Sequence, residues 1–267
     1  QEYGISLFRL GAISSLALNA QENANILLKH TVTDIQKSVA GWQISSEYEG
    51  EKRSDDFDYL INAAGFETGA LDDMMNYQRK RFVEFKASYI SQWQEQNELW
   101  PEIIFPGERG TPRGMAQLTP YAGGYFQLHG MTKEITLFDD GLVQSTDTSA
   151  HPELGSKYVR KLEQHWSDDE SLARSKAAID FVGQYMPEFK EATAISTPLY
   201  GAQQIPGEDE TLRAAEVSFE KGRYARCEIV KASSVLTMAR RIHEELINLN
   251  LASDSEVVFH TSESINT

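Results

Sequence analysis

The sequence Asp58-Tyr59-Leu60-Ile61-Asn62-Ala63-Ala64-Gly65 is the most informative stretch of this chain. Its short apolar run predicts a buried strand. The two alanines and the glycine that follow leave room for another backbone or a ligand to come very close. Open α/β sheets bind cofactors at such strand ends, although tight packing of a helix on the strand would need the same small residues. The stretch therefore predicts an α/β fold with a candidate binding loop at Ala63-Ala64-Gly65.

The residues before this stretch predict a helix and several strands. A helical period of apolar residues between Ile5 and Leu18 predicts an amphipathic helix that packs on the strands after it. We expect this helix to cover the sheet to which Val32 and Ile61 belong. The segments around residues 30–35 and 42–46 have strand-like composition, with a turn at Gly41 between them.

The pattern changes after Arg81 to closely spaced strands with glycine-rich turns, which indicates an antiparallel sheet. The predicted strands cover residues 82–87, 103–105, 114–119, 125–129 and 134–138. Helices follow, and one of them begins at Ser167 with a capping box that includes Glu170. After Thr197 the chain returns to strands and a final helix. We therefore predict one domain from residues 1–78 and 196–251, a second domain at 79–195, and a polar tail at 252–267.

Four polar residues of the predicted antiparallel sheet have odd numbers. Arg113 and Gln117 share one face of their strand, and Gln127 and His129 share one face of theirs. A three-residue turn through Ala122-Gly123-Gly124 would bring the two pairs to one face of the sheet, whereas a two-residue turn would separate them. On one face, the four side chains could bind a substrate carboxylate or hydroxyl, with Arg113 as the anion-binding group. A solvated sheet face is the alternative.

The segment from about Ile5 to Gly69, with Ala63-Ala64-Gly65 at the end of its last strand, resembles the FAD-binding half of the D-amino-acid-oxidase-like flavoproteins. The resemblance implies an α/β (α+β) fold in which a partial Rossmann-like FAD-binding domain is interrupted by a largely antiparallel substrate domain. It implies oxidation of an amine, amino acid or related small substrate by hydride transfer to flavin. The substrate domain is then the 79–195 segment.

The resemblance also implies roles for single residues. Val32 lies where the family recognises adenine, Ala63-Ala64-Gly65 would lie beside the flavin, and Val230 and Lys231 would begin the helix that points at the pyrimidine end of the flavin. His129 and Arg226 are the candidate catalytic residues. Arg113, Gln117 and Gln127 are the candidate substrate-binding residues.

One element of the family is missing from the sequence. No Gly-x-Gly-x-x-Gly motif occurs, although this loop normally binds the FAD pyrophosphate. We therefore expect the chain to be a later fragment of a longer flavoprotein and to hold FAD weakly or not at all by itself. The alternative is a non-catalytic acidic α/β protein that binds a ligand or partner. A hydrolase using Asp72 with Asp73, or Asp139 with Asp140, is disfavoured because consecutive side chains do not converge.

The composition excludes several classes of function. The 40 acidic residues outnumber the 25 basic ones, and the resulting charge of -15 disfavours binding to nucleic acid or to anionic membranes. Cys227 is the only cysteine, which suits a reducing, cytoplasmic location. The six histidines show no metal-binding spacing, and no apolar run is long enough to span a membrane. We expect a small-molecule substrate; the sequence leaves the oligomeric state open.

Overall fold

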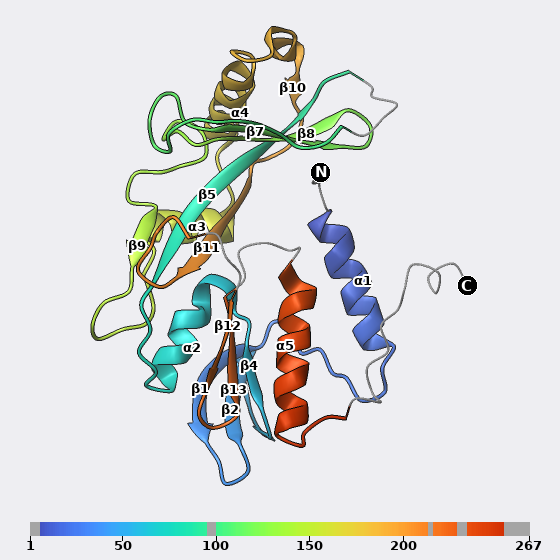
Figure 1. The fold of residues 1–267 in the computed structure, drawn as a ribbon, viewed down its shortest axis with the longest axis vertical. Coiled ribbons are helices and arrows are strands. Elements are labelled where there is room, and N and C mark those ends of the chain that lie inside the picture. Colours follow the sequence, from blue (N-terminus) through green and yellow to red (C-terminus); the bar gives the residue numbers. More distant parts are fainter. Residues whose placement is uncertain (1–5, 95–99, 213–215, 229–233, 254–267) are drawn as a thin grey trace. The chain divides into compact units, whose positions relative to one another are not determined.

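The computed structural model describes residues 6–94, 100–212, 216–228 and 234–253 (Figure 1). The chain divides into two compact units, each built from three separate segments. Unit 1 contains residues 1–29, 83–144 and 153–203, and unit 2 contains residues 30–82, 145–152 and 204–267. These units differ from the predicted domains mainly at residues 1–29, which group with unit 1.

Unit 1 contains a large sheet with helices. Its elements are α1 (Leu7–Asn19), β5 (Arg81–Gln92), β6 (Ile103–Phe105), β7 (Ala116–Tyr121), β8 (Tyr125–Gly130), β9 (Leu142–Gln144), α3 (Ser156–Gln164), α4 (Asp168–Val182), the 3-10 helix η2 (Pro187–Glu191), β10 (Thr193–Ala194) and β11 (Leu199–Pro206). The first residues of β5 and the last residues of β11 belong to unit 2. The strand order is β10-β5-β8-β7-β6, and β9 and β11 also pair with β5. The sheet confirms the predicted mixed α/β architecture with a large antiparallel sheet.

Alternation along the central strands gives this sheet one apolar face. Phe85, Ala87 and Tyr89 of β5 are buried together with Phe126 and Leu128 of β8. Tyr89 pairs with Leu128, so the odd positions of β5 share a face with the even positions of β8. Because successive strand residues point to opposite faces, the polar residues between them lie on the other side.

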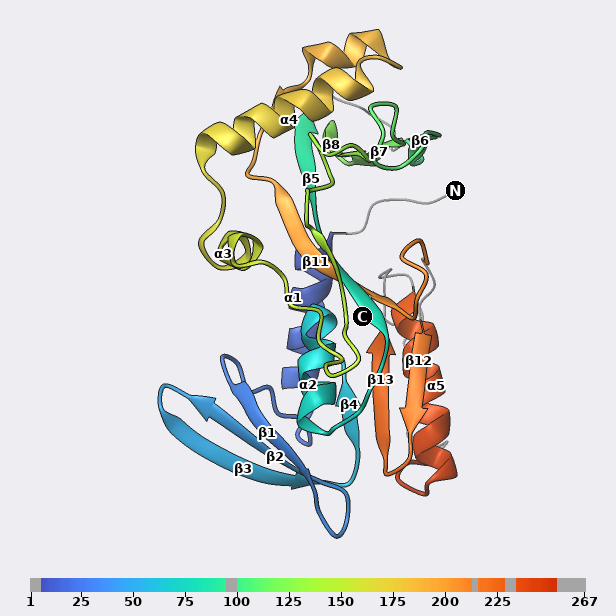
Figure 2. The ribbon, with the colours of Figure 1, turned by 90° about the vertical axis from the view of Figure 1, so that its left-hand side faces the viewer.

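Helix α4 covers the apolar face. Its Ala178, Ile179, Phe181 and Val182 are buried in the same cluster as Leu118 of β7. Figure 2 shows α4 running across the end of the sheet. The predicted cap is present, since Ser167 accepts a hydrogen bond from the Glu170 backbone N–H at 3.4 Å.

A three-residue turn joins β7 to β8. Tyr121 pairs with Tyr125, and Thr119 pairs with Gln127, so odd positions oppose odd positions. Gly123 and Gly124 both have positive φ, and a Cβ on Gly124 would lie 2.1 Å from the carbonyl oxygen of Gln94. The turn therefore requires glycine. Its three-residue length places the odd-numbered side chains of β7 and β8 on the same face of the sheet.

Residues 134–136 form turns and residues 137–138 have no regular structure, in place of the predicted strand. The Thr136 backbone N–H donates to the Gly130 carbonyl at 3.1 Å, and the Gly130 N–H donates to Thr136 Oγ1 at 3.1 Å. These bonds fold the segment back onto the end of β8. Ile135 and Leu137 are both buried, but they lie in this folded-back segment and not in a strand.

Helix α1 forms where the sequence predicts it, and its packing on the strands of Val32 and Ile61 stays a prediction. Leu7, Ile13 and Leu16 are 66%, 65% and 70% exposed, and no residue of the helix is buried. The helix also groups with unit 1, whereas Val32 and Ile61 belong to unit 2. A helical period shows which side chains share a face, but it does not specify what covers that face.

Unit 2 contains two three-stranded sheets. Its elements are β1 (Thr31–Lys37), β2 (Trp42–Tyr48), β3 (Glu51–Phe57), β4 (Leu60–Asn62), the 3-10 helix η1 (Gly65–Glu67), α2 (Thr68–Met74), β12 (Glu216–Glu220), β13 (Tyr224–Glu228) and α5 (Val235–Asn248). One sheet has the order β1-β2-β3, and the other has the order β12-β13-β4. The pairing of β4 with β13 is parallel. Met238 and Ile242 of α5 pack on Val217 and Cys227 of the second sheet.

Small residues allow close packing around α2. A Cβ on Gly69 would lie 2.3 Å from the carbonyl oxygen of Ala150, so the segment 145–152 lies directly against the start of this helix. Asp73 holds the same segment by accepting hydrogen bonds from the Ser149 hydroxyl at 2.6 Å and from the Ala150 N–H at 2.7 Å. No helix in the described part of the chain is long and apolar enough to cross a bilayer.

Candidate functional site

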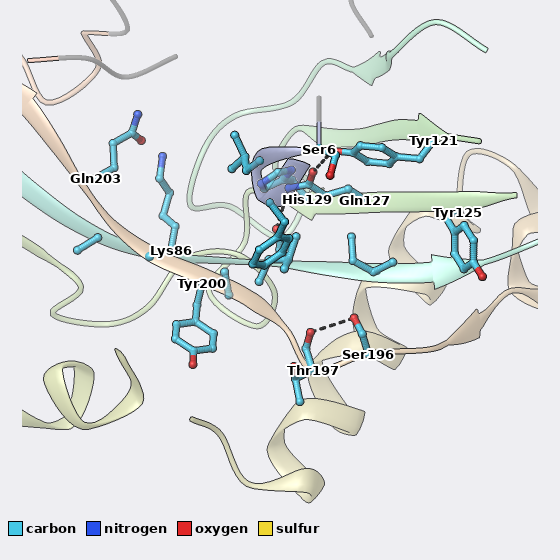
Figure 3. A pocket seen from close by; sticks show the side chains of 18 residues that line it. Ser6, Lys86, Tyr121, Tyr125, Gln127, His129, Ser196, Thr197, Tyr200 and Gln203 are labelled. Atoms are coloured by element: carbon cyan, nitrogen blue, oxygen red, sulfur yellow. Dashed lines mark hydrogen bonds between the residues drawn. The ribbon is translucent and has the colours of Figure 1, made fainter. Parts of the chain in front are cut away.

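A pocket of about 840 Å³ lies on the polar face of the unit 1 sheet (Figure 3). The lining residues come from α1, β5, β7, β8, β11 and the residues before β11. They are Ser6, Leu7, Phe8, Lys86, Ala87, Ser88, Ile90, Tyr121, Tyr125, Gln127, His129, Ser196, Thr197, Leu199, Tyr200, Gly201, Ala202 and Gln203. The volume falls in the range of pockets that hold small organic molecules.

Gln127 is held by two hydrogen bonds inside this pocket. Its Oε1 accepts from the Tyr121 hydroxyl at 2.9 Å, and its Nε2 donates to Ser88 Oγ at 2.9 Å. Figure 3 shows Gln127 between Tyr121 and His129 on one side of the pocket. Both ends of the amide are engaged, so Gln127 orients the neighbouring hydroxyls.

His129 is the pocket residue with an unpaired buried atom. Its Nδ1 is buried and has no hydrogen-bond partner among the described residues. Burial, followed by the positive charge of Lys86, lowers the pKa of His129 to about 4, and Glu102 opposes this shift. The imidazole is therefore neutral at pH 7 and can accept a hydrogen bond from a bound group.

Lys86 brings positive charge to the pocket. Its Nζ lies 3.3 Å from Oε2 of Glu84, which is 3% exposed. Glu84 also forms an ion pair with Arg109. One carboxylate thus faces two cations, so the three groups together carry one net positive charge.

The structure does not bring all the predicted substrate residues into the pocket. Gln117 Nε2 donates to Oε1 of Glu102 at 2.6 Å, and the Thr119 hydroxyl donates to the same oxygen at 2.7 Å. Gln117 pairs with His129 across β7 and β8, but it does not line the pocket. The predicted odd-numbered face is therefore formed, with Glu102 bound to one part of it.

Arg113 lies away from this pocket. It is exposed in a turn before β7, and not on the strand itself. Together with Pro106 and Tyr185 it lines a separate cavity of about 610 Å³. The expectation that Arg113 shares a strand face with Gln117 is therefore corrected, because β7 begins only at Ala116.

Arg226 is buried in unit 2. Its Nε donates to Asp72 Oδ2 at 2.7 Å, and its Nη2 donates to Oδ1 at 2.8 Å. Burial alone would lower the pKa of Arg226, but the hydrogen bonds and charge of Asp72 outweigh burial and raise it. The side chain is 0% exposed, and its guanidinium group is paired with the Asp72 carboxylate.

A buried ion cluster surrounds this pair. We use that name for Asp72, Arg79, Arg81, Tyr224, Arg226 and Glu228. Arg81 Nη2 lies 2.6 Å from Asp72 Oδ2 and 3.2 Å from Glu228 Oε1. Arg79 Nε donates to Glu228 Oε2 at 2.8 Å, and the Tyr224 hydroxyl donates to Asp72 Oδ1 at 2.7 Å. Burial and then the Asp72 charge raise the pKa of Tyr224.

The predicted cofactor residues differ in how far they are exposed, and two of them lie outside the described residues. Ala63, Ala64 and Gly65 are exposed directly after β4, and a Cβ on Gly65 would meet nothing within 4 Å. Val32 is partly buried in the cluster around Trp42. Val230 and Lys231 lie outside the described residues. The space around Gly65 is open, and the sequence contains no Gly-x-Gly-x-x-Gly phosphate loop, so the cofactor role of these residues stays a prediction. The described residues contain no cluster that could hold a metal ion.

Most residues of the pocket, among them Lys86, Ser88 and Tyr121, were not predicted from the sequence. Lys86 and Ser88 are polar residues in the middle of β5, and Tyr121 ends β7. The alternation Glu84, Lys86, Ser88 was a usable signal. It shows that β5 presents charge to one face, and a strand buried on both sides retains charge only where a partner or ligand meets it.

Comparisons with known proteins identify the fold. No family model matches the sequence, and no curated protein matches it. Several solved structures are similar over most of the chain. NikD, an unusual amino acid oxidase essential for nikkomycin biosynthesis, has a TM-score of 0.58 and 12% identity, and the match covers 96% of this chain and 58% of that chain.

Two further structures extend this similarity. L-proline dehydrogenase from P. horikoshii has a TM-score of 0.52 at 12% identity, and the match covers 91% of this chain and 56% of that chain. Glycerol-3-phosphate dehydrogenase from Bacillus halodurans, complexed with FAD, has a TM-score of 0.52 at 14% identity and covers 84% of this chain and 39% of its own. The chain thus shares the fold of part of these three oxidoreductase structures and spans 39–58% of their length.

Proposed function

We propose that this chain forms the substrate pocket and part of the FAD-binding domain of an oxidoreductase that oxidises an amine, amino acid or related small substrate by hydride transfer to flavin. The observation that carries the proposal is the pocket on the polar sheet face in unit 1. Support comes from the flavoenzyme folds that match most of the chain, among them an amino acid oxidase and a proline dehydrogenase. A preformed, largely apolar pocket with a few convergent polar groups is the usual form of a small-molecule site.

In this proposal His129 meets the reacting end of the substrate. Its imidazole is kept neutral by the lowered pKa and can accept a hydrogen bond from a substrate amine. Gln127 holds Tyr121 and Ser88 in fixed positions around that group. When bound, FAD supplies the hydride-accepting chemistry, and the protein supplies orientation and electrostatics.

On the cofactor side we propose the loop Ala63-Ala64-Gly65, together with Val32, Val230 and Lys231. The chain has no phosphate loop of its own. The proposal therefore requires a further polypeptide segment that carries a glycine-rich turn at a helix N-terminus. Arg226 is assigned to the buried ion cluster and has no catalytic role in this scheme.

The test is the flavin content of the protein isolated from its source at native length. We expect the visible absorption band of oxidised flavin in that protein, and little or no retention of added FAD by residues 1–267 after gel filtration. Turnover of amines and amino acids with flavin reduction would complete the test. Absence of flavin from both forms, after reconstitution with FAD, would contradict the proposal.

The missing phosphate loop also favours a second candidate function. In this alternative the chain is a non-catalytic ligand-binding protein that uses the same pocket without FAD. It predicts that small molecules bind to the flavin-free chain and that FAD does not change the protein at any concentration. The two candidates therefore differ in the flavin measurement and agree on the location of the pocket.

A further inference from the structure

Gly201 is a glycine that the folded chain itself does not require. It lies within β11, and glycine destabilises a strand because it has no side chain to pack. Its φ is not positive, and an added Cβ would meet no atom within 4 Å. Among the glycines that the structure describes, only Gly11 in helix α1 shares both properties. A strand glycine without such a reason often marks a place where a ligand approaches the backbone closely.

The absent side chain leaves a notch in the wall of the pocket. Successive strand residues point to opposite faces, so Gly201 shares its face with Leu199 and Gln203. All three line the pocket, and Figure 3 shows Gln203 and Tyr200 pointing in opposite directions from β11. Leu199 and Gln203 carry long side chains, whereas the position between them is open down to the backbone. The notch at Gly201 can therefore accept part of a ligand.

Large apolar side chains around the pocket are exposed. Phe8 is 83% exposed, Leu7 is 66% exposed and Leu199 is 37% exposed, and all three line the pocket. Tyr125 adds an aromatic ring that is 39% exposed. Because the burial of apolar surface is favourable, a ligand with an apolar or aromatic body gains affinity by covering these side chains. Exposed apolar groups gathered at a pocket are typical of a ligand-binding groove.

The polar end of the pocket and the notch lie on different strands. Ser91 of β5 pairs with Phe126 of β8 and with Ala194 of β10, so β8 and β10 flank β5 on opposite sides. Strand β11 follows β10 in the chain and also pairs with β5. His129 on β8 and Gly201 on β11 are therefore separated by β5, and two strand spacings amount to about 10 Å. A ligand that contacts both must be at least that long, which excludes molecules as small as glycine or proline.

We infer that this pocket takes an elongated substrate, whose polar end meets His129 and whose flat apolar or aromatic body extends across β5 into the notch at Gly201. The inference rests on the proposed function and deepens it by naming the substrate class and by making Gly201 the residue that sets the length of the substrate. Nδ1 of His129 is buried and has no partner among the described residues, so it suits the polar end. Ile90 of β5 lines the pocket between the two strands and supplies an apolar surface for the body.

The experiment compares two isomers that differ in length but not in composition. 2-(Naphthalen-2-yl)ethanol and 2-(naphthalen-1-yl)ethanol are titrated by calorimetry into the purified 267-residue chain without flavin. Both carry one neutral hydroxyl group that can donate to His129 and the same ring system, so a nonspecific apolar surface binds them equally. We expect the longer 2-naphthyl isomer to bind about tenfold more tightly, because only its outer ring reaches the notch. Equal affinities, preference for the 1-naphthyl isomer, or no binding of either at millimolar concentration would overturn the inference.

Variants assign the preference to Gly201. Gly201→Leu fills the notch and should weaken binding of the 2-naphthyl isomer about tenfold, to the level of the 1-naphthyl isomer, whose affinity stays the same. Gly11→Leu is the matched control, because an added Cβ at Gly11 also meets open space but Gly11 does not line the pocket. This control should leave both affinities unchanged. Retention of the isomer preference in Gly201→Leu would remove Gly201 from the site.

Circular dichroism spectra and melting temperatures of the glycine variants establish that they are folded before the titrations are compared. Gly201→Ala adds one methyl group to open space. It provides the same test, with a smaller loss of affinity for the 2-naphthyl isomer, if the leucine variant does not fold.

This result and the flavin test can fail separately. Preference for the longer isomer in the chain, with no flavin in the native-length protein, would contradict only the oxidoreductase function. Flavin in the native-length protein, with equal binding of the two isomers, would contradict only the inference about the substrate.

Discussion

The buried ion cluster of unit 2 and the pocket of unit 1 hold their polar groups differently. In the cluster, both oxygens of Asp72 accept hydrogen bonds from arginines, although Arg81 Nε and Nη1 are buried without a partner there. In the pocket, the buried His129 Nδ1 has no partner among the described residues. A buried carboxylate that is fully paired indicates structure, whereas an unpaired group in the wall of a cavity indicates binding. Charge density along the sequence does not separate these two cases.

The largest effect should come from breaking the cluster. Asp72→Asn removes the charge that faces Arg226 and Arg81 and leaves both guanidinium groups buried without full compensation. We expect a loss of about 3–5 kcal/mol in the free energy of unfolding, measured by urea denaturation.

Asp147→Asn is the matched control for this variant. Asp147 belongs to the same unit and forms an exposed ion pair with Lys80. Exposed pairs contribute little to stability, so this variant should unfold at the same urea concentration as the wild type. Similar losses in both variants would show that the cluster is no more than a set of ordinary ion pairs.

The pH dependence of stability should reveal the unpaired imidazole. Burial and then Lys86 lower the pKa of His129 from 6.5 to about 4, so the unfolded chain binds more protons between these two pH values. The wild type should therefore lose stability as the pH falls from 6.5 to about 4, by at most about 3 kcal/mol from this residue.

His129→Gln should lose less stability over the same pH interval, because glutamine does not titrate. The comparison uses urea denaturation of both proteins at a series of pH values, and acid titration of carboxylates elsewhere affects both equally. If the free energy of unfolding changed with pH equally in wild type and variant, His129 would be in an environment that resembles water.

An added methyl group should destabilise the closely packed part of unit 2 but not the open pocket of unit 1. Gly69→Ala would place a Cβ 2.3 Å from the Ala150 carbonyl oxygen in unit 2, and such overpacking costs about 1–3 kcal/mol. Gly201 lines the pocket, and a Cβ there would meet nothing within 4 Å. Gly201→Ala should therefore leave the melting temperature unchanged. Equal tolerance at both positions would contradict the tight contact between α2 and the segment 145–152.

The smallest effect should come from one hydrogen bond in the pocket. Tyr121→Phe leaves Oε1 of Gln127 without its 2.9 Å donor, but a pocket that admits water can replace it. We expect a loss of about 1 kcal/mol or less in the free energy of unfolding. A loss as large as that of Asp72→Asn would show that the Tyr121–Gln127 pair is a buried structural group like the cluster.

Local patterns predicted much of the fold. The antiparallel sheet followed from alternation, the start of α4 from its capping residues, and the odd-numbered polar face from Gln127 and His129 together with one of two possible turns. These features depend on residues close in sequence.

Partners far apart in the sequence could not be predicted. Arg226 lies in a segment dense in charge, but its partner Asp72 is 154 residues away, and nothing near Arg226 specifies that pairing. The same limit applies to the exposed face of α1 and to Lys86, whose role depends on how Glu84 is shared with Arg109. Tertiary contacts decide such cases, and propensity and spacing do not.

The alternation of the chain between two units has a consequence for its synthesis. Strand β4 pairs with β13, and Asn62 of β4 donates to the Tyr224 hydroxyl across 162 residues. A ribosome that makes the chain from its N-terminus releases β4 long before its neighbour exists. Unit 1 is likewise incomplete until residue 203 has emerged. Neither unit can complete its sheet on the nascent chain before these residues are made, so the edge of β4 that pairs with β13 stays open until then.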